Sequence, residues 1–152
     1  MIRFLYPTFP TGRGAVGLFI VRAVTGAAFI QHGWPKIQNP FGWMPGESPP
    51  PAVLQALAAL SEFGGGIALI LGLLTPLAAF GIACTMVTGI GIVHLRAGDP
   101  FVSATGGRSW ELAAVYLAIM ILLLLVGPGS FSVDALLFGK RAQAAARVPE
   151  IR

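Results

Sequence analysis

The fold is decided by long apolar runs, and the clearest of them is residues 77–95, LAAFGIACTMVTGIGIVHL. This run contains no lysine, arginine, aspartate or glutamate. At a rise of ~1.5 Å per residue it would form a helix roughly 30 Å long, which matches the thickness of the hydrocarbon core of a bilayer. The run therefore predicts a transmembrane helix.

Three more runs have the same character, at residues 15–33, 53–74 and 110–126. Hydrophobic residues make up 55% of the 152-residue chain and charged residues only 11%, so there is too little polar surface to shield four such helices from water. The bilayer must be their solvent. We therefore expect residues 1–152 to form a single membrane domain, an all-α, integral membrane four-helix bundle.

The chain after the fourth run predicts one further, shorter helix. The Gly-Pro-Gly sequence at 127–129 interrupts the fourth helix, and apolar residues return within 132–138. Ser132 can cap the start of a helix there, and Gly139 can end it. A short apolar segment of this kind is typical of a helix that lies in the membrane interface. The expected fold is thus a four-helix bundle with a short C-terminal interfacial helix.

The distribution of cations predicts the orientation in the membrane. The two long loops hold only Lys36, Arg96 and Arg108. Six cations lie nearer the ends of the chain: Arg3, Arg13, Lys140, Arg141, Arg147 and Arg152. Because positively charged flanking segments stay on the cytoplasmic side, both termini are expected to face the cytoplasm.

Several classes of function are disfavoured by the composition. The formal charge is +4, but the lysines and arginines are scattered between apolar runs, so they suit helix ends at a lipid surface better than a nucleic-acid-binding patch. Cys84 is the only cysteine, which excludes an internal disulfide and paired-thiol redox chemistry. No nucleotide-binding or haem-attachment motif occurs.

Two charged residues, Arg22 and Glu62, lie inside the predicted helices, where charges are costly and need partners. Counted from the outer helix ends at ~1.5 Å per residue, Arg22 lies ~15 Å deep and Glu62 ~12 Å deep. We expect them to form a buried ion pair, which would either fix the helix register or take part in function. Glycines on the same helix faces, at Gly26, Gly33 and Gly66, would let backbones or a planar ligand approach closely.

A second polar group is predicted near the outer ends of the helices. His32 and Lys36 end the first helix, and His94 ends the third at the same level. Glu111 joins them at the start of the fourth. The group could hydrogen-bond the oxygens of a quinone and relay its protons, since His and Glu suit this chemistry. It could instead bind a metal or haem, although few further ligands are available. It could also be an inert polar cap.

Motifs along most of the chain resemble the DoxX family of small bacterial membrane proteins. The resemblance extends from about Gly17 to Leu137 and rests on these motifs: Val21-Arg22, Gly26, Phe29 and His32-Gly33-x-x-Lys36 in the first helix; Ser61-Glu62-Phe63-Gly64-Gly65 and Leu71-Gly72-Leu73-Leu74-Thr75 in the second; His94, Gly106-Gly107 and Trp110-Glu111 further on; and Gly127-Pro128-Gly129 with Ser132-x-Asp134-Ala135-Leu136 at the end.

The resemblance implies a four-helix bundle in the bacterial inner (plasma) membrane with a redox association. Some family members are subunits of enzymes that oxidise thiosulfate with quinone, and others are associated with protection against oxidative stress. The sequence departs from the family at Pro76 and in its proline-rich first loop, residues 34–52. The family's recurrent polar positions match six residues: Arg22, His32, Lys36, Glu62, His94 and Glu111.

The resulting hypothesis is a redox-linked membrane subunit that binds quinone or a similar small molecule near the outer face. In this hypothesis the catalytic residues, which take up and release protons, are Glu62, His94 and Glu111. The cofactor-binding residues are Arg22, His32 and Lys36. No metal site is expected, and electrons would come from a soluble or membrane redox partner protein or from a bound substrate. The alternative is a non-catalytic scaffold or assembly factor that recruits soluble enzymes. Association into a homo-oligomer is left open.

Overall fold

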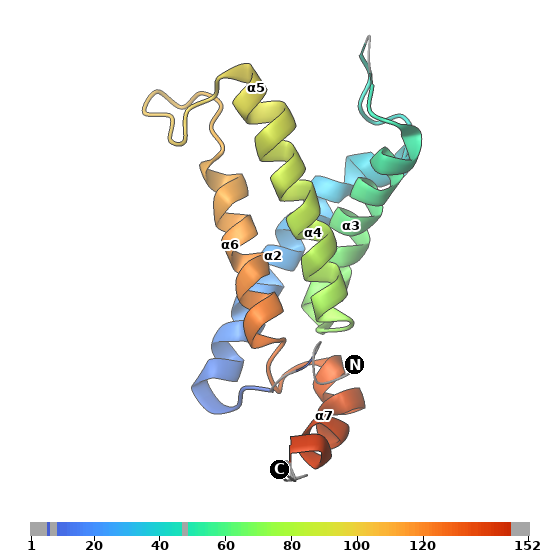
Figure 1. Cartoon of the computed structure of the whole chain (residues 1–152), viewed down its shortest axis with the longest axis vertical. Helices are drawn as coiled ribbons and strands as arrows, with labels where there is room; N and C mark the ends of the chain where they lie inside the picture. Colours follow the sequence, from blue (N-terminus) through green and yellow to red (C-terminus); the bar gives the residue numbers. More distant parts are fainter. Residues whose placement is uncertain (1–5, 7–8, 47–48, 147–152) are drawn as a thin grey trace, which may run out of the picture.

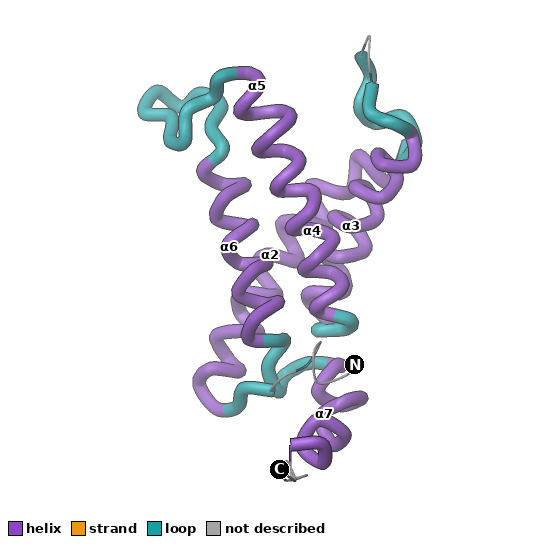
Figure 2. The backbone as a smooth tube through the Cα atoms, viewed as in Figure 1, coloured by secondary structure: helices purple, strands orange, loops and turns teal. Residues whose placement is uncertain are grey.

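The computed structural model describes residues 6, 9–46 and 49–146, and within these ranges the chain forms only helices and connecting loops (Figures 1 and 2). The elements in chain order are α2 (Gly12–Gln38), α3 (Ala52–Leu71), α4 (Thr75–Thr88), η1 (Gly89–His94), α5 (Leu95–Ala97), α6 (Glu111–Val126) and α7 (Val133–Ala146). Because α4, η1 and α5 follow one another without a gap, they make one continuous rod.

The helices confirm the predicted all-α membrane bundle. Among the described residues, three helical rods are long and apolar enough to cross a membrane: Gly12–Gln38, Ala52–Leu71 and Thr75–Ala97. The remaining apolar helix, α6, has 16 residues. A helix of that length, at ~1.5 Å per residue, covers most of the hydrocarbon core when it stands with little tilt.

The bundle has two distinct ends (Figure 1). The loops that follow α2 and α5 lie at one end, which we call the loop end. The short α3–α4 turn, the start of α2 and α7 lie at the other, which we call the turn end. In the bundle α2 packs most extensively against α3, α3 packs against α4, and α4 packs against α6.

Glycines allow α2 and α3 to pack with their backbones in close contact. A Cβ atom added at Gly26 would lie 2.6 Å from the carbonyl oxygen of Gly66. A Cβ added at Gly33 would lie 2.7 Å from the Cα of Phe63. Such contacts between small residues are the usual way in which helices associate tightly in lipid. The close approach predicted from these glycines is therefore present.

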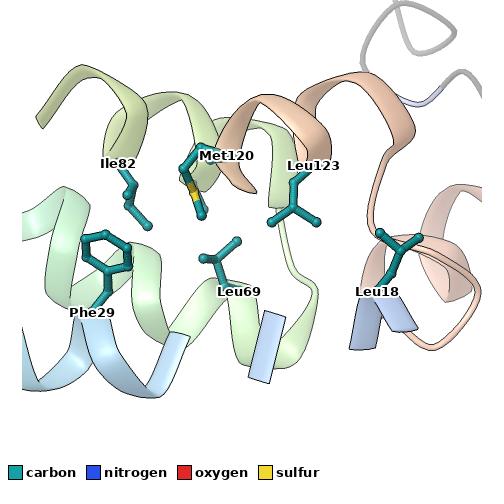
Figure 3. Packing of buried hydrophobic residues seen from close by; sticks show 8 residues of the cluster. Leu18, Phe29, Leu69, Ile82, Met120 and Leu123 are labelled. Atoms are coloured by element: carbon teal, nitrogen blue, oxygen red, sulfur yellow. The ribbon is translucent and has the colours of Figure 1, made fainter. Parts of the chain in front are cut away.

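The core is apolar, but so is much of the outer surface. Figure 3 shows the buried side chains that meet between the helices: Leu18, Phe29, Leu69, Ile82, Met120 and Leu123. Large apolar side chains also point outward, among them Leu125 at 72% exposure and Val24 at 67%. A soluble protein rarely leaves so much contiguous apolar surface uncovered, whereas lipid tails solvate it without cost.

Two helices continue well beyond the residues at which the sequence predicts their ends. The first was expected to end at residue 33, yet α2 continues through Pro35 to Gln38. Proline removes one backbone hydrogen bond, and membrane helices tolerate this because neighbouring groups can satisfy the freed carbonyl. The last helix was expected to end at Gly139, yet α7 runs to Ala146. The alanine-rich segment after Gly139 favours continuation enough to offset one glycine.

The predicted cap of the last helix is confirmed, because the hydroxyl of Ser132 accepts a hydrogen bond from the backbone N–H of Ala135 at 3.1 Å.

The second helix is shorter than expected and ends at Leu71 instead of residue 74. Gly72 has a φ of +65°, a conformation that ends helices and suits glycine, and Leu74 also has a positive φ, +48°. The interfacial position of α7 stays a prediction.

Candidate functional site

Arg22 does not pair with Glu62, so the expected ion pair is wrong. Arg22 is fully buried at the turn end, where its Nη1 donates to the carbonyl oxygen of Leu69 at 3.3 Å and its Nη2 donates to that of Phe131. The depth estimate failed because it took the outer ends of the two helices as level. The glycine contacts instead place Gly33 beside Phe63, which sets Glu62 near the end of α2 and far from Arg22.

Asp134 completes a buried cluster around Arg22 that holds the turn end together. Its two carboxylate oxygens accept hydrogen bonds from the backbone N–H groups of Leu74 at 2.7 Å and Thr75 at 2.8 Å, which caps the start of α4. Burial, reinforced by the Asp134 carboxylate, raises the pKa of Tyr6, which lies on the same side. Arg22 thus belongs to the buried cluster at the turn end and does not contact the polar group at the loop end.

A pocket of about 310 Å³ lies between the helices toward the loop end. Four of the residues predicted as site residues line it, namely His32, Lys36, Glu62 and His94. Its other lining side chains include polar Ser109 and Tyr116 and apolar Phe29, Met86, Leu112 and Ala113. Since α2, α3, η1 and α6 each supply part of the lining, the pocket exists only when the whole bundle is assembled.

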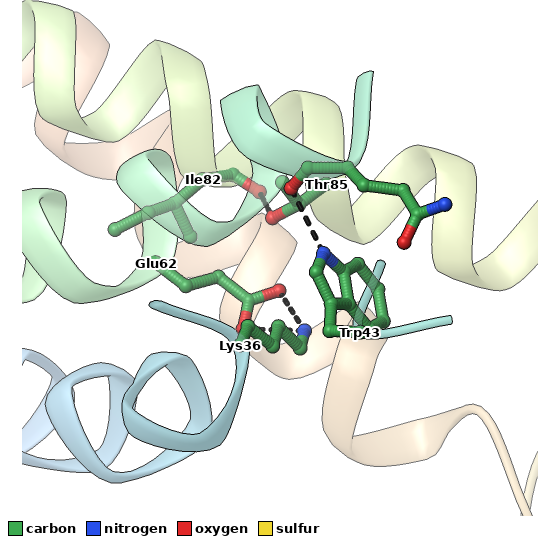
Figure 4. A network of polar contacts seen from close by, with 6 residues as sticks. Lys36, Trp43, Glu62, Ile82 and Thr85 are labelled. Carbon is green, nitrogen blue, oxygen red and sulfur yellow. Dashed lines mark hydrogen bonds and ion pairs between the residues drawn. The ribbon is translucent and has the colours of Figure 1, made fainter. Parts of the chain in front are cut away.

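Lys36 and Glu62 form the ion pair of the pocket (Figure 4). The Nζ atom of Lys36 lies 2.5 Å from Oε1 and 2.6 Å from Oε2 of Glu62. The Glu62 side chain is only 4% exposed and that of Lys36 is 23% exposed, so the lysine is the more accessible partner. The Nζ atom also lies 4.6 Å from the centre of the Trp43 ring, a cation–π contact.

Trp43 belongs to the loop after α2, which is fastened to the start of α3. Its indole N–H donates to the backbone oxygen of Gln55 at 2.9 Å. The side chain of Gln55 accepts from the N–H of Met44 and donates to the carbonyl of Pro50, both at 2.9 Å. The proline-rich loop thereby brings an aromatic ring to the ion pair, a role for Trp43 that the sequence did not reveal.

Sequence reasoning also missed Asp99. Nδ1 of His94 lies 2.8 Å from Oδ2 of Asp99, and Nε of Arg108 lies 3.2 Å from the same oxygen. The contact depends on η1, a wide π-type turn that ends at His94, and on Gly98, whose φ of +72° turns the chain back. Turns of the π type are found frequently at functional sites.

Aromatic rings form one wall of the pocket. The rings of Phe29 and Tyr116 have centres 4.9 Å apart, and the His32 ring lies 6.3 Å from Tyr116. Glu111 does not line the pocket; it is exposed in the first turn of α6, next to the lining residue Leu112. In the described part of the chain, no three His, Cys, Asp or Glu side chains are placed to hold a metal ion.

The fold and the pocket define a small helical membrane protein with a partly open, mostly apolar pocket between its helices, into which an ion pair and two histidines are set. The chain belongs to the DoxX family, because the sequence model of that family matches residues 17–95. It is also 32% identical over 126 residues to "Inner membrane protein YqjF" of Escherichia coli (strain K12), an alignment that covers 80% of this chain and 92% of the relative. No solved structure matches the chain. The resemblance noted in the sequence is thus confirmed.

Proposed function

We propose that the protein is a redox-linked membrane subunit that binds a quinone or a similar small molecule in the pocket at the loop end. The observation that supports this proposal is a single chamber combining an ion pair, two histidines and an aromatic wall. A volume of about 310 Å³ is at the lower end of the range for small-molecule sites. It suits a single ring whose apolar tail would extend outside the chamber.

The lining residues provide the contacts that such a ring needs. Tyr116, packed against the buried ring of Phe29, offers an aromatic surface against which planar aromatic groups pack favourably. The ammonium group of Lys36 can donate to a ligand oxygen, and His94 can exchange a proton with one. Glu62 neutralises the lysine, which makes a charged donor tolerable inside a membrane protein.

Five of the six predicted site residues take a role in this proposal that is consistent with their positions. Lys36 and His32 would contact the ligand, while Glu62 and His94 would hold or move protons. Glu111, exposed beside the pocket, would exchange protons with the aqueous phase. Arg22 has no part in this site, because it lies in the turn-end cluster. Electrons would come from a partner protein or from a bound substrate.

Binding can be tested with duroquinone, a tail-free tetramethyl quinone, and protein purified in mild detergent. We expect saturable quenching of tryptophan fluorescence, since Trp43 lies beside Lys36. Replacing His94 by alanine should weaken binding of the reduced form, duroquinol, by about tenfold, the effect of losing one hydrogen bond to the ligand. Arg13→Gln, at the exposed start of α2, is the matched control and should bind as the unmodified protein does.

Failure of the folded, unmodified protein to bind duroquinone, together with mass spectra of gently purified protein that show only lipid, would overturn the proposal. Co-purification of a soluble enzyme in a fixed ratio under those conditions would favour the scaffold function instead. A bound hydroquinone in an anaerobic extract, lost in the His94→Ala variant, would support the pocket as its site.

We also propose that the protein lies in the bacterial inner membrane with both termini in the cytoplasm. The named location of the Escherichia coli relative and the distribution of cations support this. Of those cations, Arg3, Arg147 and Arg152 lie outside the described residues. Alkaline phosphatase, which is active only outside the cytoplasm, should be inactive when fused to the C-terminus and active when inserted at residues 106–107. The reverse pattern would contradict the orientation.

A further inference from the structure

The contact between His94 and Asp99 fixes which nitrogen of the imidazole carries hydrogen. An ionised carboxylate can only accept hydrogen bonds, so Nδ1 of a neutral His94 must donate to Oδ2 of Asp99 across 2.8 Å. Nε of Arg108 lies 3.2 Å from the same oxygen and forms an ion pair with the carboxylate. The other ring nitrogen, Nε2, then has no hydrogen and is an acceptor. No hydrogen bond to it occurs within the described part of the chain, and His94 lines the pocket.

The charged acceptor of the pocket, Glu62, is paired with Lys36. Both oxygens of Glu62 face the Nζ atom of Lys36, at 2.5 and 2.6 Å. The hydroxyl groups of Ser109 and Tyr116 can donate or accept, and so can the ring of His32. His94 is therefore the lining residue whose role as donor or acceptor is determined by a contact outside the pocket. That contact makes its Nε2 an acceptor.

We infer that the His94–Asp99 pair makes the pocket prefer the hydroxyl-bearing form of its ligand, a hydroquinone, over the corresponding quinone. A hydroquinone O–H can donate to Nε2, whereas a quinone carbonyl can only accept and would face a lone pair. Asp99 is a positioning residue in this scheme, since it acts through His94. The inference rests on the proposed function and adds which redox form the site holds more tightly.

The test compares the binding of duroquinol with that of duroquinone, under anaerobic conditions and in mildly alkaline buffer. The unmodified protein should bind the hydroquinone about tenfold more tightly. An asparagine at position 99 can either accept from Nδ1 or donate to it, so Asp99→Asn frees the ring to carry its hydrogen on Nε2. The preference should then fall to within about threefold, mostly through tighter quinone binding.

Nitrogen-15 NMR of the imidazole rings provides a readout that a purely structural role would not change. The chain has two histidines, so His94 can be assigned by comparison with a His94→Gln variant. We expect hydrogen on Nδ1 in the unmodified protein and a mixture of both tautomers in Asp99→Asn. Equal binding of the two ligands by the unmodified protein would overturn this inference and leave the proposed function standing. Binding of neither would overturn the proposed function itself.

Discussion

Replacing Gly33 by alanine is expected to lower the melting temperature of the purified protein by roughly 10 °C. The added Cβ would lie 2.7 Å from the Cα and 2.8 Å from the Cβ of Phe63, and its nearest neighbours belong to the backbone of α3. A backbone cannot move aside as a flexible side chain can, so α2 and α3 must separate. Thermal unfolding in detergent, followed by circular dichroism or tryptophan fluorescence, measures the change.

Gly17→Ala is the matched control, because it makes the same substitution in the same helix. A Cβ at Gly17 meets nothing within 4 Å, and alanine favours a helix by up to about 1 kcal/mol over glycine. The control should therefore melt at the same temperature as the unmodified protein or slightly higher. Equal stability of the two alanine variants would show that α2 and α3 do not touch at Gly33.

Replacing Asp134 by alanine is expected to cost about 3–5 kcal/mol of stability, the usual result of removing one partner from a buried charged cluster. The side chain is fully buried, and its loss leaves the N–H groups of Leu74 and Thr75 without their acceptor. The Arg22 guanidinium would also lose a nearby opposite charge while remaining buried. Denaturant titration in mixed micelles can measure the change in the free energy of unfolding.

A double-mutant cycle separates the charge effect from the loss of the cap. Arg22→Met removes the cation, so Asp134→Ala in that background loses only its hydrogen bonds. The loss in the double variant should therefore be smaller than the sum of the two single losses by about 1 kcal/mol or more. Simple additivity would mean that Arg22 and Asp134 stabilise the turn end independently.

The sequence predicted the helices well and their ends less well. Long unbroken apolar runs such as 77–95 predict a membrane helix, because a helix satisfies all its backbone hydrogen bonds within one segment and needs about 20 such residues to cross the lipid. The ends depend on weaker preferences, and the helices continue through Pro35 and Gly139 although proline and glycine both disfavour a helix interior. The cap at Ser132 was predictable because capping acts within a few residues of the chain.

Part of the candidate site followed from helix direction alone, since antiparallel helices bring His32, Lys36 and His94 to one end of the bundle. The helix directions did not predict which charged side chains pair within the bundle. The partner of Glu62 depends on how far α2 is shifted along α3. The glycine contacts determine this shift, and it cannot be calculated by counting residues from the helix ends. Asp99 escaped notice because its contact with His94 needs a π-type turn and a reversal at Gly98.

The pairing of Lys36 with Glu62 also has a consequence for how the chain is made. Both residues belong to the first two spans, so they can meet as soon as this hairpin leaves the ribosome and enters the translocon. An unpaired charge costs about 2.5–3.5 kcal/mol at the centre of an inserting helix and less toward its ends, and a joined pair presents almost no net charge to lipid. The protein thus compensates these two charges early in synthesis, and the lining of the pocket is complete once α6 has followed.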